Sequence, residues 1–103
     1  MILELNSDNL SSFIESGCVM VDIYGDHCNP CKQLMPNIEQ LSNDLGDRIS
    51  IGKLNINDGV EFMHEYGVRN IPTLLIFKHG ELIDRNIGFL SMNELSDFVN
   101  KHL

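Results

Sequence analysis

Apolar residues along the chain alternate between continuous runs, typical of strands, and stripes with helical spacing. The run Val19–Tyr24 is nearly continuous and rich in β-branched residues, as expected of a central strand buried on both faces. Further runs predict strands at Ile2–Leu5, Ile49–Asn55, Thr73–Phe77 and Leu82–Ile87. The segment Lys78-His79-Gly80-Glu81 separates the last two strands, which predicts a β-hairpin.

Segments with helical spacing lie between these strands. From Pro30 to Leu45 the apolar residues fall on one stripe, formed by Leu34, Ile38, Leu41 and Leu45, and Gly46 stands where a helix cap belongs. Further helices are predicted at Asp8–Ser16, at Val60–Tyr66 and after the capping box Ser91-Met92-Asn93-Glu94. The order β-α-β-α-β-α-β-β-α predicts an α/β fold, in which helices flank both faces of a central mixed five-stranded sheet.

Composition narrows the class of protein. The chain has 103 residues, 43% of them hydrophobic, which is enough for a single domain spanning residues 1–103. A formal net charge of −8 argues against nucleic acid as a partner, because phosphate binding needs clustered Lys and Arg. No stretch approaches the roughly 18 apolar residues that span a membrane, and Met1–Leu5 does not resemble a signal peptide. We therefore expect a cytoplasmic monomer with no membrane partner.

Two of the three cysteines, Cys28 and Cys31, lie two residues apart at the start of the longest predicted helix. A helix N-terminus carries about half a positive charge and unpaired N–H groups, so it favours the thiolate of Cys28 over the thiol. Cys31, about one turn further on, is placed to close a disulfide with it. One close pair in an odd number of cysteines fits a catalytic dithiol in the cytosol rather than a secreted disulfide framework.

Other interpretations of the cysteines stay open at this point. The pair could form a structural disulfide, or half of a metal site, although zinc normally takes four ligands. Cys18, which lies apart from the pair, is expected to be a small apolar filler, with a regulatory thiol as the alternative.

Asp22 is a carboxylate within a strand that is otherwise predicted to be buried. Because an isolated buried charge is costly, its pKa should rise until the group can hold a proton near pH 7. It is therefore a candidate base for activating Cys31, through a water molecule. Alternatively, Asp22 is merely paired with Lys53 or turned to solvent at the margin of the sheet.

Several segments taken together resemble the thioredoxin family over nearly the whole chain. They are Cys28–Lys32, with the pattern Cys-x-Pro-Cys-Lys, then Val21-Asp22, Lys53-Leu54-Asn55-Ile56, Arg69-Asn70-Ile71-Pro72-Thr73-Leu74, and Gly88 in the last strand. A Cys-x-x-Cys pair alone is a weak signal, but in this context the joint signal is strong. The resemblance implies a thioredoxin fold and a cofactor-free reductase of protein disulfides that is itself reduced by a thioredoxin reductase.

The resemblance also implies roles for individual residues. Cys28 would be the nucleophile, Cys31 the resolving thiol, Asp22 a buried proton acceptor, and Lys53 the residue that modulates Asp22. A cis peptide would precede Pro72, where trans is the default, and would face the dithiol. The residues expected to contact substrate are His27, Asn29, Pro30, Ile71, Pro72, Thr73 and Gly88. Ile71 would pair through its backbone with an extended substrate, and Ile56 and Ile87 are further candidates that could equally belong to the core.

The chain departs from the family pattern inside the motif itself. The usual Trp-Cys-Gly-Pro-Cys is here His27-Cys28-Asn29-Pro30-Cys31, and the chain contains no tryptophan. A protonated His27 would stabilise the Cys28 thiolate; alternatively, the imidazole only occupies the place of the indole. These departures bear on the redox potential and the substrate groove. They keep two other functions in view: an oxidoreductase dedicated to one partner, and an adaptor module with a vestigial dithiol.

Overall fold

A computed structural model describes all 103 residues and confirms the predicted element order, with two short 3-10 turns added. The elements are β1 (Ile2–Leu5), α1 (Leu10–Ile14), β2 (Cys18–Tyr24), α2 (Asn29–Leu45), η1 (Gly46–Arg48), β3 (Ser50–Asn55), η2 (Ile56–Asp58), α3 (Val60–Glu65), β4 (Thr73–Lys78), β5 (Glu81–Ile87) and α4 (Met92–Asn100). No helix has both the length and the apolar character that crossing a bilayer requires.

The five strands form one mixed sheet, as predicted, and their order in it is β1-β3-β2-β4-β5. Strand β3 runs parallel to both β1 and β2, because helices connect these strands along the chain. Strand β4 runs antiparallel to β2 and to β5, and the β4–β5 pair is the predicted hairpin. Strand β2, which leads directly into the dithiol, is therefore central, with a neighbour on each side.

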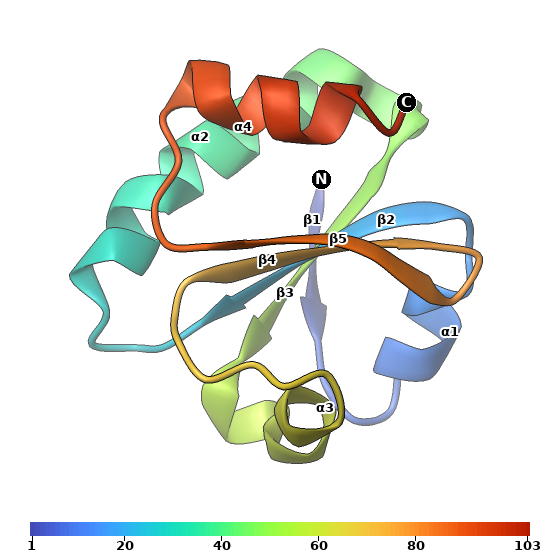
Figure 1. Cartoon of the computed structure of the whole chain (residues 1–103), viewed down its shortest axis with the longest axis vertical. Helices are drawn as coiled ribbons and strands as arrows, with labels where there is room; N and C mark the ends of the chain where they lie inside the picture. The colour runs from blue at the N-terminus through green and yellow to red at the C-terminus, as the bar shows by residue number, and fades with distance from the viewer.

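Helices cover both faces of the sheet, with α2 and α4 on one side and α1 and α3 on the other (Figure 1). Each side has its own apolar cluster. The first cluster joins Met20 and Leu74 of the sheet to Leu34 of α2 and Leu95 of α4. The second joins alternate strand residues to Leu10 and to Phe62 and other residues around α1 and α3. This alternation is the two-residue period of a strand buried on both faces.

Element ends differ from the predicted ones where polar side chains and turn geometry intervene. The first helix ends at Ile14 rather than at the predicted Ser16. It begins at Leu10 rather than at the predicted Asp8, because the side chain of Asn6 accepts hydrogen bonds from the backbone N–H groups of Asp8 and Asn9 and forms a turn first. Strands β4 and β5 each extend one residue further into the hairpin than predicted. Only His79 and Gly80 remain in the turn, both with positive φ, as tight two-residue hairpins require.

Candidate functional site

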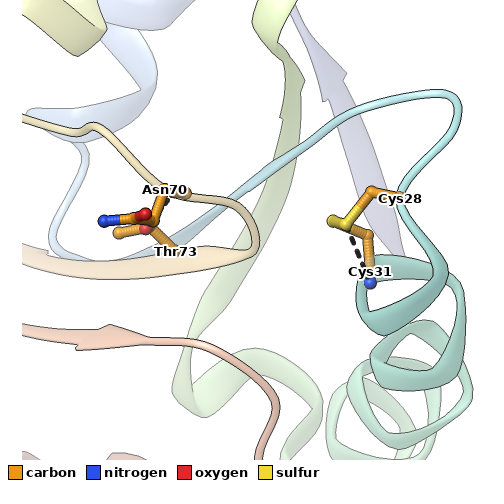
Figure 2. The surroundings of a disulfide bond; sticks show 4 residues. All are labelled: Cys28, Cys31, Asn70 and Thr73. Atoms are coloured by element: carbon orange, nitrogen blue, oxygen red, sulfur yellow. Dashed lines mark hydrogen bonds between the residues drawn. A yellow bond between two sulfur atoms is a disulfide. The ribbon is translucent and has the colours of Figure 1, made fainter.

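The dithiol lies where strand β2 gives way to helix α2. Cys28 is the N-cap residue of α2, and Pro30 occupies its first turn, where a missing N–H is harmless. The backbone N–H of Cys31 donates a hydrogen bond to Sγ of Cys28, with an N···S distance of 3.2 Å (Figure 2). The sulfur of Cys28 thus occupies the position that a capping oxygen takes in most helices. This is the predicted placement of an anion-stabilising helix end.

Cys28 and Cys31 are joined in a disulfide, with their Cα atoms 5.2 Å apart. Both residues are buried, but Cys28, 9% exposed, is more accessible than Cys31, which is 3% exposed. Cys18 is a free thiol at the start of β2 and is only partly buried. No three or more His, Cys, Asp or Glu side chains gather as a possible set of metal ligands.

The loop that precedes β4 faces the disulfide across the end of β2 (Figure 2). The Ile71–Pro72 peptide bond in this loop is cis, as the family resemblance predicts. The hydroxyl of Thr73 donates to the carbonyl of Asn70 at 2.6 Å, and the N–H of Gly88 donates to the carbonyl of Pro72 at 2.8 Å. Both hydrogen bonds fix the loop, and Ile71 of this loop lines the same hollow as Cys28.

A shallow hollow of about 600 Å³ opens beside the sulfur of Cys28. It brings together several residues expected to contact substrate, which are His27, Asn29, Pro30, Ile56 and Ile71. Other candidates lie outside its lining. Thr73 is buried with its hydroxyl bonded to Asn70, and Ile87 is 59% exposed on the last strand, beside Gly88.

Sequence reasoning missed three residues that line this hollow: Gly25, Asp26 and Asn57. Gly25 lets the two sides of the hollow approach, since a methyl group there would lie 2.7 Å from Cδ1 of Ile71 and 3.4 Å from Cδ1 of Ile56. A glycine between a buried strand and a dithiol was the available signal, because close approach of a backbone is a common reason for glycine.

Asp22 is fully buried, and neither of its carboxylate oxygens has a hydrogen-bond partner in the protein. Burial raises the pKa of Asp22 from 3.8 to about 7, against a smaller opposing effect of the Lys53 charge. The alternative in which Asp22 turns to solvent is therefore wrong. Lys53 does not form an ion pair with it either; its ammonium lies 3.7 Å from a carboxylate oxygen of Glu4.

The direction of the Asp22 side chain follows from the alternation along β2. Met20, two residues earlier, packs in the same cluster as Leu34 and Ile38 of α2. Asp22 therefore points to the sheet face that α2 covers. Cys31 is buried on that helix one turn before Leu34, so the carboxyl group and the inner sulfur belong to facing elements.

Comparisons with known proteins agree with this geometry. A family model described as Thioredoxin matches residues 1–101. A thioredoxin of Bacillus subtilis (strain 168) is 35% identical over 102 residues, covering 99% of this chain and 98% of that protein. A thioredoxin of Chlamydia pneumoniae is 38% identical over 102 residues, covering 99% of both. One of Rickettsia prowazekii (strain Madrid E) is 42% identical over 85 residues, covering 82% and 81%.

Matches of this extent span the strand, the dithiol, the cis-proline loop and the hairpin together. They exclude a chance Cys-x-x-Cys pair on an unrelated fold. The chain therefore belongs to the thioredoxin family, and it is a thiol–disulfide oxidoreductase whose redox-active pair is Cys28 and Cys31.

Proposed function

We propose that Cys28 is the nucleophile and Cys31 the resolving thiol in the reduction of protein disulfides. The Cys28 thiolate attacks one sulfur of the substrate disulfide, which forms a mixed disulfide and releases the other substrate sulfur as a thiolate. Deprotonated Cys31 then attacks Sγ of Cys28, releasing the second substrate thiolate and leaving the Cys28–Cys31 disulfide. The observation that carries this assignment is the helix-capping position of Sγ of Cys28, which accepts the N–H of Cys31.

Asp22 is the proton acceptor for Cys31 in this proposal, and Lys53 modulates it. Resolution requires that Cys31 lose a proton while it is shielded from bulk solvent. A carboxyl group whose pKa lies at about 7 can take up that proton near neutral pH and give it back, which an ordinary aspartate with a pKa near 4 cannot. The buried, unpartnered state of Asp22 supports this role.

The substrate docks in the hollow beside Cys28, with Asn29 and Pro30 on one side and Ile71 on the other. The backbone of Ile71 makes no hydrogen bond within the protein, so it is free to pair with an extended peptide. His27 is exposed on the rim and presents an imidazole to the partner. Ile87, the last residue of β5, and Gly88, which follows that strand, extend the contact for larger substrates.

Gly25→Ala tests whether this hollow recognises protein substrates. The added methyl displaces Cδ1 of Ile71, which is the far end of a flexible side chain. The fold is therefore expected to persist while the hollow changes shape. We expect a several-fold lower kcat/KM for insulin, with an unchanged rate of Cys28 alkylation by iodoacetamide after reduction. An unchanged kcat/KM for insulin would show that Ile71 does not contribute to docking.

Membership of the thioredoxin family supports the rest of the proposal. Electrons come from a thioredoxin reductase, and the protein works as a cytoplasmic monomer without a cofactor. A coupled assay of NADPH consumption with a purified bacterial thioredoxin reductase and insulin tests this cycle. Sustained turnover is expected. Turnover with dithiothreitol but not with reductase would contradict the proposed donor, and turnover with neither would favour an adaptor module.

A further inference from the structure

Three charged side chains form a row across the sheet, and the proposed mechanism uses only two of them. Lys53 of β3 is the register partner of Glu4 on β1 and of Asp22 on β2. The row lies on the face that α2 covers, because Ile2, Met20 and Ile51, each two residues earlier on its strand, pack with that helix. A single ammonium group therefore stands between two carboxylates.

Lys53 is engaged with the outer of these two carboxylates. Its Nζ lies 3.7 Å from Oε1 of Glu4, and the side chains of Lys53 and Glu4 are 33% and 54% exposed. Pairing with Glu4 lets the ammonium stay partly hydrated, whereas pairing with Asp22 would bury both charges.

Tyr24 fixes this arrangement from the end of β2. Its hydroxyl donates to Oε2 of Glu4 at 2.9 Å, and Nζ of Lys53 lies 5.6 Å from the centroid of its ring. Burial, with Glu4 as acceptor, raises the pKa of Tyr24 to about 12, so the hydroxyl remains a donor at neutral pH. The carboxylate of Glu4 is thus held by Tyr24 and Lys53. Because β3 lies between β1 and β2, Glu4 and Asp22 are on opposite sides of Lys53.

We propose that Glu4 is a positioning residue that competes with Asp22 for the Lys53 ammonium and thereby keeps the Asp22 carboxyl able to hold a proton. The inference rests on the proposed role of Asp22 as the acceptor for Cys31. Removing the charge of Glu4 frees Lys53 to swing toward Asp22, and it also removes a distant negative charge. Both changes favour the ionised form of Asp22, so they act in the same direction.

Among the groups around Asp22, Lys53 is the one whose charge affects the pKa of the carboxyl group. Strand β4 places the apolar Leu74 beside it. The titratable groups on the remaining neighbours are Cys31 and Glu39 of α2, Tyr24 of β2, and the Met1 ammonium, which donates to Ser42 at 2.7 Å. Of all these charges, that of Lys53 is the one that lowers the pKa of Asp22.

The test follows the titration of the Asp22 carboxyl carbon by NMR in the oxidised protein, where neither active-site sulfur titrates. In Glu4→Gln the midpoint is expected to fall by about half a pH unit or more. Glu61→Gln, which removes the same charge from helix α3 on the opposite face, is expected to leave it in place. An unchanged or higher midpoint in Glu4→Gln overturns the competition.

A double-mutant cycle with Lys53→Gln distinguishes competition for the Lys53 ammonium from the direct electrostatic effect of Glu4 on the pKa of Asp22. Adding Glu4→Gln to Lys53→Gln is expected to move the midpoint much less than Glu4→Gln does alone. Equal shifts in both backgrounds overturn the proposal.

The pH profile of mixed-disulfide resolution is measured in parallel. If the Asp22 midpoint moves but this profile does not, the competition stands and the assignment of Asp22 as proton acceptor fails.

Discussion

Replacing Cys28 by serine is expected to abolish catalysed insulin reduction, leaving only the rate of dithiothreitol alone. A serine hydroxyl is not ionised at the helix end near neutral pH and cannot form the mixed disulfide. Cys31→Ser is expected to behave differently, because the proposed nucleophile, Cys28, remains. It should attack once and then accumulate as a covalent complex with the substrate, since nothing displaces the captured sulfur. Mass spectrometry of the unreduced reaction mixture detects that complex.

Cys18→Ser is the matched control for both variants, because it removes the one thiol outside the pair. It is expected to retain the insulin-reduction rate of the wild type. Catalysed reduction that persists in Cys28→Ser would contradict the assignment of the nucleophile. Accumulation of the covalent complex in Cys28→Ser rather than in Cys31→Ser would reverse the two roles.

Asp22→Asn is expected to stabilise the oxidised protein at pH 8 by up to about 4 kcal/mol, while slowing substrate turnover. Folding raises the pKa of this carboxyl from 3.8 to about 7, so the folded protein holds the proton more tightly than the unfolded chain does. A pKa difference of about three corresponds to about 4 kcal/mol at about 1.4 kcal/mol each. The destabilisation is absent below pH 3.8, grows as the pH rises, and is complete above about pH 7.

Urea unfolding at a series of pH values measures this effect. The wild type is expected to lose stability relative to Asp22→Asn as the pH rises from 4 toward 8. Asp97→Asn, which removes an exposed carboxylate from α4, serves as the control. A wild-type protein whose stability parallels that of Asp22→Asn at every pH would show that the carboxyl is not desolvated. An Asp22→Asn variant that is more stable but reduces substrate more slowly would show that the wild type loses stability to keep a group for proton transfer.

Local sequence signals were sufficient to predict those parts of the site that are formed by residues close together in the sequence. The Cys-x-x-Cys pair, the proline in the first helical turn and the apolar strand before them predict the capped sulfur of Cys28. The apolar neighbours of Asp22 in β2 likewise predict a buried carboxyl with a raised pKa. Each of these features depends on residues only a few positions apart.

Features that depend on strand register were not predictable from the same signals. Glu4 meets Lys53 only because β1 pairs with β3 in one particular alignment, and a shift of one residue would move Glu4 to the opposite face. Gly25 was missed because its importance comes from Ile71, a residue far along the chain. Thr73 was expected at the substrate surface, but its hydroxyl is used to fix the loop.

Both sulfurs belong to the first turn of a helix that is anchored in the core through Leu34, Ile38 and Leu41. We therefore expect the bond between them to form and break by side-chain rotation, without movement of the helix. In the proposed cycle, the electron donor and the electron acceptor react with the same redox pair, one after the other. The two cannot be bound at once, so each must depart before the other arrives, and turnover follows a ping-pong order.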